Sequence, residues 1–239
     1  MSTFLPINLP SRCLVYEGVE ADSVKARAYQ GKDEVYLAQI NPTNLERNYY
    51  EVLRDLIQGV DPLKLTLGDR MYIILWECVN SYTSTLNVST VCSHCLASEL
   101  VTVDLRNIEA NELPEDFKQP YSVKLSTGKE IFLRLLTVDD EIKTEKYGKE
   151  KEDDFLYRYA RSVVTDDDIL QTLEKFREMP AKDVLRIVAF QEKFFHGPVM
   201  ESKFTCSKCG EGDTVEVPFR FEFFFPDVSQ LAESFGEGI

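Results

Sequence analysis

The chain has 239 residues, of which 41 are acidic and 27 basic, so its formal net charge is −14. Hydrophobic residues make up 44%, which is ordinary for a protein with a buried core, and no apolar run approaches the roughly 20 residues of a membrane-spanning helix. Nucleic acid is disfavoured as a partner, because a phosphate backbone needs a concentrated basic surface. The N-terminus lacks the features of a secretory signal, so we expect a cytoplasmic protein without a membrane partner.

The N-terminal third predicts extended segments followed by two helices. Residues 5–16 contain prolines and lack helical periodicity, and residues 23–40 predict two extended or hairpin segments around Gln30-Gly31-Lys32. The first helix is predicted from about Thr43, capped by Asn41 or Thr43, to near Gly59. Its apolar face consists of Leu45, Tyr49, Val52, Leu53 and Leu56.

The second helix is predicted over residues 67–82, where the apolar residues are nearly continuous and burial on most sides is expected. Cys78 falls within this helix. Free cysteine is among the most buried residue types, so Cys78 is interpreted as a core thiol, and Cys13 in the same way.

The middle of the chain is rich in strand patterns. Residues 84–92 and 100–108 alternate as two arms of a hairpin, and residues 121–137 predict another hairpin that turns at 126–129. Residues 138–154 are almost all charged and are interpreted as a solvated helix end or linker. The carboxylates in 137–141 and 165–168 are expected to cap helices rather than hold a divalent cation.

Helices are predicted next, followed by a last pair of strands. The helical segments cover residues 154–164, 165–180 and 181–195, with Thr165 or Asp166 as the cap of the second and Pro180 just past its end. Residues 200–227 then predict two alternating arms around the second cysteine pair. The division expected from these patterns is 1–88, 89–136, 137–200 and 201–239, in one composite domain.

Two CxxC pairs are the most specific chemical signal in the sequence. Cys92 and Cys95 lie at one predicted hairpin tip, and Cys206 and Cys209 lie at another. Each such turn, called a knuckle below, supplies two thiolates, and two facing knuckles complete the tetrahedral shell of zinc. Four thiolates close that shell, so the zinc is predicted to be structural. The fold class is therefore α+β, with split zinc-ribbon-like hairpins, a helical N-terminal region and a helical insertion between the knuckles.

Other uses of the thiols remain open. A thioredoxin-like couple is expected at a helix N-terminus rather than a hairpin tip, and disulfides are disfavoured without a signal peptide. Spacing alone does not exclude an iron–sulfur cluster. His94 lies between two cysteines and is expected to point outward. No catalytic pattern is recognisable, so a non-enzymatic protein is expected.

The C-terminal segment "VPFRFEFFFPD" is strongly aromatic. Phe219, Phe221 and Phe223 alternate on one strand face, which favours a core strand. Phe221, Phe223, Phe224 and Phe225 are alternatively candidates for a contact with another subunit, because aromatic side chains dominate well-packed interfaces.

The order of these features resembles one protein family. "LPSR", an early helix pair, "CSHC" before "VDL", a long insertion and a late knuckle followed by "FFFP" resemble baseplate hub subunit and assembly proteins of T-even-type contractile-tailed bacteriophages. The resemblance implies a structural or chaperone-like assembly role with hub or tape-measure proteins as partners. It also implies a location in the host cytoplasm during assembly, and leaves open whether the protein stays in the virion tail baseplate.

Two rival functions share the cysteine pattern. One is a zinc-ribbon protein that binds nucleic acid or acts in transcription, which the acidic composition opposes. The other is a thiol oxidoreductase or an iron–sulfur protein that uses the same four cysteines.

Overall fold

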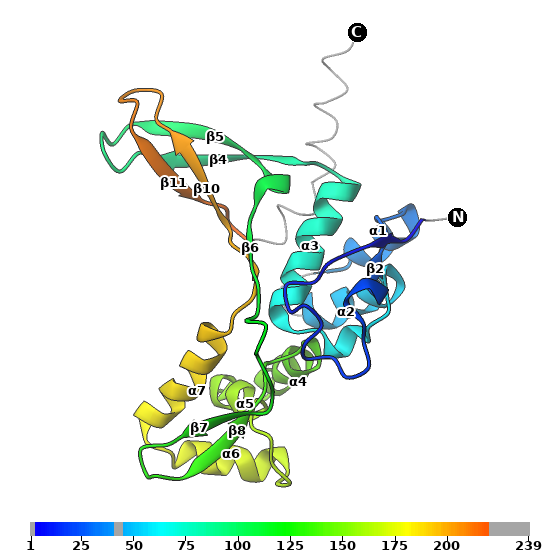
Figure 1. Ribbon diagram of the computed structural model, residues 1–239, viewed down its shortest axis with the longest axis vertical. Coiled ribbons are helices and arrows are strands. Elements are labelled where there is room, and N and C mark those ends of the chain that lie inside the picture. Colours follow the sequence, from blue (N-terminus) through cyan, green and yellow to red (C-terminus); the bar gives the residue numbers. More distant parts are fainter. Residues whose placement is uncertain (1–2, 41–44, 220–239) are drawn as a thin grey trace. The chain divides into compact units, whose positions relative to one another are not determined.

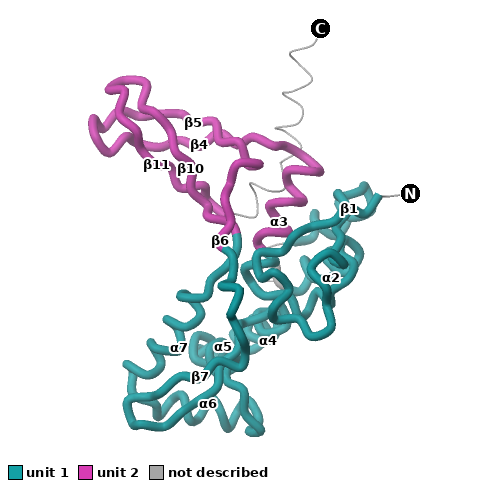
Figure 2. The backbone as a smooth tube through the Cα atoms, viewed as in Figure 1, with its two compact units in different colours: residues 1–70, 112–197 teal, residues 71–111, 198–239 magenta. Residues whose placement is uncertain are grey.

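The computed structural model describes residues 3–40 and 45–219, and the chain divides into two compact units (Figure 2). Unit 1 comprises Met1–Arg70 and Glu112–Gly197, and unit 2 comprises Met71–Asn111 and Pro198–Ile239. Each unit is therefore assembled from two separate stretches of chain. The mixture of helices and small antiparallel sheets agrees with the α/β content predicted from the sequence.

Helices and short strands occur in groups along the described chain (Figure 1). The α-helices are α1 (Gly31–Leu37), α2 (Leu45–Leu56), α3 (Leu67–Ser81), α4 (Val138–Gly148), α5 (Asp154–Ala160), α6 (Ile169–Arg177) and α7 (Ala181–Lys193). The strands are β1 (Leu5–Pro6), β2 (Lys25–Ala26), β3 (Ile57–Gln58), β4 (Thr85–Val91), β5 (Ser98–Asp104), β6 (Ala110–Asn111), β7 (Tyr121–Lys124), β8 (Glu130–Leu133), β9 (Gly197–Pro198), β10 (Glu201–Thr205) and β11 (Gly212–Glu216). Short 3₁₀ turns are η1 (Ala21–Ser23), η2 (Pro62–Lys64) and η3 (Leu105–Asn107). None of the helices in the described residues has the length and apolar character needed to cross a membrane.

The predicted helix after residue 43 is confirmed as α2. Its apolar face is buried at Tyr49, Val52, Leu53 and Leu56. The candidate caps Asn41 and Thr43 lie outside the described residues. In the same unit β1, β2 and β3 form a three-stranded antiparallel sheet.

The extended segment predicted after Gln30 is wrong, because residues 31–37 form helix α1. Gln30 and Asp33 close a capping box at its start, in which each side chain accepts from the backbone of the other. Arg27 donates two hydrogen bonds to the Asp33 carboxylate, at 2.7 and 3.0 Å, and both side chains are buried. A short helix is stabilised here by a buried ion pair between residues six positions apart, which hydrophobic periodicity does not indicate.

The charged run after Leu136 is also more structured than predicted. Residues 138–148 form α4, which begins with a capping box between Thr137 and Asp140. Asp140 is fully buried and accepts hydrogen bonds from Arg134 and Arg161. The capping role expected for these carboxylates is confirmed, but Asp140 also anchors α4 to the segments that carry both arginines.

Unit 1 has an aromatic-rich core beneath the β7–β8 hairpin. The cluster consists of Leu113, Phe117, Leu133, Leu135, Ala160, Phe176, Ile187, Phe190 and Phe194. The predicted turn at 126–129 is confirmed, and Asp183 of α7 accepts from the Ser126 amide and hydroxyl at 2.8 and 2.6 Å. Helix α6 is capped by Asp168 rather than by Thr165 or Asp166, because the Asp168 carboxylate accepts from the Gln171 amide.

A buried polar cluster closes the start of α3 in unit 1. Asp69 accepts hydrogen bonds from the Ser11 amide at 2.9 Å and the Tyr16 hydroxyl at 2.5 Å. The Thr66 hydroxyl lies 2.6 Å from His196 Nε2. Burial, followed by the neighbouring Asp69 charge, raises the pKa of Tyr16 well above its usual value. The tyrosine therefore stays a neutral donor to Asp69.

Two antiparallel hairpins form most of the described part of unit 2. β4 pairs with β5 and β10 pairs with β11, as the sequence predicts. One face of each hairpin is buried, through Val88 and Val103 in the first and Val215 in the second.

Cys78 of α3 is buried, which confirms its interpretation as a core thiol, and Cys13 in unit 1 is buried as well. Burial raises the pKa of each of these two thiols to about 11.

Candidate metal centre

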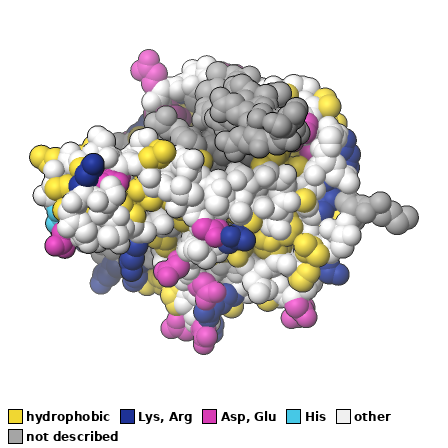
Figure 3. Space-filling model, turned by 90° about the horizontal axis from the view of Figure 1, so that it is seen from above, with side chains coloured by type: hydrophobic (Ala, Val, Ile, Leu, Met, Phe, Trp, Pro, Cys, Tyr) yellow, Lys and Arg dark blue, Asp and Glu magenta, His cyan; other side chains and the backbone are white. Residues whose placement is uncertain are grey.

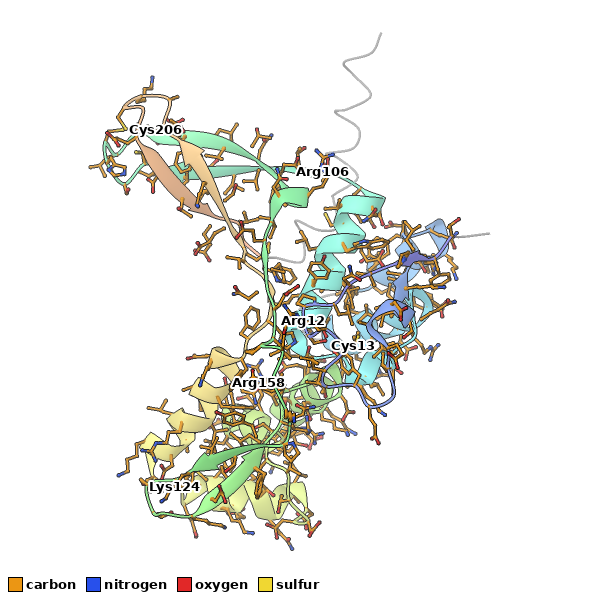
Figure 4. All side chains as sticks on the ribbon, viewed as in Figure 1. Arg12, Cys13, Arg106, Lys124, Arg158 and Cys206 are labelled. Atoms are coloured by element: carbon orange, nitrogen blue, oxygen red, sulfur yellow. The ribbon has the colours of Figure 1, made fainter. Side chains whose placement is uncertain are left out.

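Both cysteine pairs lie in the connections at the tips of the unit 2 hairpins. The first pair follows β4, whose last residue Val91 is opposite Ser98, and the second follows β10, whose last residue Thr205 is opposite Gly212. Figure 4 labels Cys206 at these tips, at the opposite end of β5 from Arg106. The antiparallel register thus holds each CxxC pair at the end of a rigid ladder.

The two knuckles have the same backbone hydrogen bonds. The Cys92 amide donates to the Ala97 carbonyl at 2.9 Å, and the Cys206 amide donates to the Glu211 carbonyl at the same distance. The amides of Leu96 and Gly210 close each turn on the carbonyl of its first cysteine, both at 3.0 Å. The two connections are therefore two copies of one local structure.

A left-handed residue follows the second cysteine in each knuckle. Its φ is +59° at Leu96 and +76° at Gly210. Glycine takes this conformation without steric cost, whereas leucine does so rarely. The first knuckle is thus the more strained copy.

The sulfur atoms of all four cysteines form one cluster. Cys92 Sγ lies 3.8 Å from Cys209 Sγ, and Cys95 Sγ lies 3.6 Å from Cys206 Sγ. All four lie within 4.8 Å of one another. A tetrahedral ion with zinc–sulfur bonds of about 2.3 Å places its sulfurs about 3.8 Å apart. The two cross-knuckle distances match that edge, so the donor set and its spacing fit a single tetrahedral ion.

The thiols differ in their surroundings. Cys92 and Cys206 are buried, whereas Cys95 and Cys209 are exposed. The Cys95 amide is the main group that lowers the pKa of Cys92, to about 7. At Cys206 the Cys209 amide favours the thiolate, but desolvation and the hydrogen bond to Glu99 outweigh it and raise the pKa to about 12. Cys206 is the thiol donor to Glu99, at 3.2 Å.

One carboxylate connects each knuckle to the opposite hairpin, and sequence reasoning missed both carboxylates. Glu99 of β5 accepts from the amide and hydroxyl of Ser207, at 3.1 and 2.9 Å. Asp213 of β11 accepts from the Ser93 amide at 2.7 Å. Their signal in the sequence is positional, because each carboxylate lies four residues after the second cysteine of its own knuckle.

His94 is exposed, and its Nε2 lies 3.2 Å from the Gly212 carbonyl of the opposite hairpin. Within the described residues, the group of side chains placed to ligate a metal contains the four cysteines and no histidine. The four cysteines that the sequence analysis singled out lie close together in the structure, while their use as metal ligands stays a prediction.

A comparison with known protein families assigns the chain to one of them. Residues 11–226 match the family described as T4 bacteriophage base plate protein. The chain belongs to this family. No curated protein matches the chain, and no solved structure matches it.

The match spans most of this baseplate protein, including stretches from both units and all four knuckle cysteines. A baseplate is an assembly of several proteins, so membership implies contacts with other structural proteins of the phage tail. The resemblance seen in the sequence is thereby confirmed at the level of the baseplate family.

The aromatic segment of this baseplate protein extends past the described residues. Phe219 is half-buried, whereas Phe221, Phe223, Phe224 and Phe225 lie outside the described residues. Their assignment to a subunit interface therefore stays a prediction.

Proposed function

We propose that this chain is a non-enzymatic structural or assembly protein of the phage tail baseplate hub, with unit 2 stabilised by a four-cysteine zinc site. The observation that supports a baseplate role is the family match over residues 11–226. The hub assignment goes further and rests on the order of sequence features, from "LPSR" through "CSHC" to "FFFP". The proposed partners are other hub or tape-measure proteins, met in the host cytoplasm during assembly.

The proposed zinc has a structural task. Unit 2 is made of two stretches separated by residues 112–197, and one knuckle comes from each stretch. Zinc would supply four bonds that join them, with Cys92 and Cys95 on one side and Cys206 and Cys209 on the other. Because four thiolates leave no open position for water, this ion would not be a Lewis-acid catalyst.

The sulfur spacing favours one ion over the alternatives weighed from the sequence. A multi-iron cluster places several metal atoms inside its ring of thiolates, so its cysteine sulfurs stand farther apart than around a single ion. Two independent redox couples need no contact between the knuckles, yet here each cysteine sulfur lies within 3.8 Å of a sulfur from the other knuckle. Each distance is well above the disulfide length of about 2.05 Å.

Charge supports a protein partner rather than nucleic acid. On the face drawn in Figure 3, the Lys and Arg side chains of the described residues are scattered among Asp and Glu rather than gathered in a patch. A net charge of −14 opposes the counterion-release term that drives binding to phosphate backbones.

Metal content tests the site. The purified protein should contain one zinc per chain, and Cys206→Ser should lose it, because three thiolates bind far more weakly than four. His94→Ala is the matched control in the same knuckle and should keep the zinc. A colourless wild-type protein without bound metal would overturn the proposed site, and a brown one would indicate an iron–sulfur cluster.

Co-purification tests the assembly role. The tagged chain should retain co-expressed hub or tape-measure proteins of the same phage, identified by mass. A chain that stays monomeric and retains none of the baseplate proteins would overturn the assembly proposal. Binding of DNA or RNA that weakens steeply with salt would favour the zinc-ribbon alternative instead.

A further inference from the structure

The two carboxylates beside the knuckles form a reciprocal pair of ties. Glu99 belongs to the first hairpin and bonds the second knuckle, while Asp213 belongs to the second hairpin and bonds the first knuckle. In each case the carboxylate accepts from the amide of the serine that directly follows a buried cysteine, Ser93 after Cys92 or Ser207 after Cys206.

The positions of the carboxylates are equivalent in the two hairpins. Glu99 is four residues past Cys95, and Asp213 is four residues past Cys209. Alternation along a strand puts Glu99 on the same face as buried Val103 and Asp213 on the same face as buried Val215. Both carboxylates therefore belong to the inner face of their own hairpin, from which they reach the knuckle of the other.

The bonded amides lie where they control the ligands. A cysteine sulfur is placed by the backbone of its own turn, and the serine amide belongs to the peptide that immediately follows the first ligand. Hydrogen bonds to a charged acceptor are shorter and roughly twice as strong as neutral ones. A carboxylate from the opposite hairpin thus fixes both the turn and its distance from the facing pair of sulfurs.

We propose that Glu99 and Asp213 are positioning residues that clasp the two knuckles together, so that the four sulfurs are held at tetrahedral spacing. This inference rests on the proposed zinc site and adds residues outside its ligand shell. The amide and hydroxyl of Ser207 donate their own protons to Glu99, so these two bonds do not use the Cys206 thiol proton.

Zinc affinity tests the clasp. Glu99→Gln and Asp213→Asn keep the size of each side chain and weaken its bond to the serine amide. Each should raise the zinc dissociation constant, measured by competition with a chelator, about tenfold, which is typical of lost outer-shell partners. Glu211→Gln is the matched control, because it removes one negative charge beside the second knuckle while its exposed side chain reaches neither serine.

Cobalt spectra and amide exchange separate the clasp from the metal site. With cobalt(II) in place of zinc, the two clasp variants should broaden the thiolate-to-cobalt absorption band, whereas Glu211→Gln should leave it unchanged. If wild type binds zinc and both clasp variants release it like Glu211→Gln, the clasp is overturned while the metal site stands. If wild type binds no metal, the zinc proposal fails, and the clasp is judged by hydrogen exchange. Protection of the Ser93 amide that is lost in Asp213→Asn then supports it, and unchanged protection overturns it.

Discussion

Removing the metal should loosen unit 2 specifically. The perturbation is chelation of zinc or the substitution Cys206→Ser. Either change opens a cross-link between residues that are 111 positions apart, from Cys95 to Cys206. In the described residues the two stretches of unit 2 are then joined by their packing, by the ties between hairpins and by backbone pairing such as the Val199 amide on the Glu109 carbonyl.

The size of the effect follows from the loop that the site closes. In the chain-entropy treatment of cross-links, a closed loop of about 100 residues contributes about 4.7 kcal/mol. That figure is an upper value here, because buried side chains such as Val88 and Val215 hold the hairpins without metal. We therefore expect a loss of about 2–5 kcal/mol in the free energy of unfolding of unit 2.

The single tryptophan provides the assay. Trp76 lies in the part of α3 that belongs to unit 2, so its fluorescence during a guanidinium titration reports on that unit. Chelated wild type and Cys206→Ser should unfold at the same reduced midpoint, and added zinc should restore only the wild type. Chelator should have no further effect on Cys206→Ser. Equal midpoints for zinc-loaded wild type and Cys206→Ser would refute the reasoning.

Two further perturbations test unit 1. Asp140→Asn should cost about 3 kcal/mol in urea unfolding, because it leaves two partly buried guanidinium groups, those of Arg134 and Arg161, without the fully buried carboxylate that they share. Burial favours the neutral acid, but the Arg134 hydrogen bond and nearby charges outweigh it and lower the pKa of Asp140. Its contribution is therefore present above the ordinary aspartate pKa of about 3.9 and lost as pH falls through the folded value, so Asp140→Asn should flatten acid unfolding. Gly68→Ala should abolish soluble expression, because the added Cβ would lie 1.4 Å from the His196 carbonyl oxygen. Gly31→Ala is the control, since a Cβ at Gly31 meets open space, and this variant should unfold at a urea concentration no lower than wild type.

Sequence patterns predicted the elements whose structure is determined by residues close together in the sequence. The apolar period of α2, the alternation of β4 with β5 and the turn at 126–129 all depend on neighbouring residues, and the structure has each of them. The cysteine spacing likewise predicted that four sulfurs lie close together. Each knuckle depends on neighbouring residues, and only the contact between the two knuckles is long-range.

The errors occurred where buried ion pairs decide the structure. Residues 31–37 form α1 with the help of Arg27, which neutralises the buried Asp33. The charged run of α4 was interpreted as solvated, yet Asp140 is buried against arginines from two other segments. A carboxylate that will be paired inside a fold has the same sequence signature as one that stays in water.

The clasp residues were missed for a related reason. Glu99 and Asp213 are ordinary acidic residues on strands, and their partners lie 108 and 120 positions away. A repeat-based comparison would have found them, since aligning the two knuckles on their cysteines also aligns the two carboxylates and the two serines. Internal similarity therefore carries information about tertiary contacts that hydrophobic periodicity does not.

A duplicated knuckle also explains how unit 2 tolerates residues 112–197 between its halves. Loop-closure entropy rises only logarithmically, by about 0.6 kcal/mol for each doubling of loop length, so a long insertion is little worse than a short one. Two hairpins joined through such a loop still need contacts that specify their register. Both knuckles share one backbone geometry. Repeating this geometry supplies the two serine–carboxylate bonds between the hairpins and also the four facing sulfurs. The proposed zinc would then replace the sequence proximity that an uninterrupted zinc ribbon has between its knuckles.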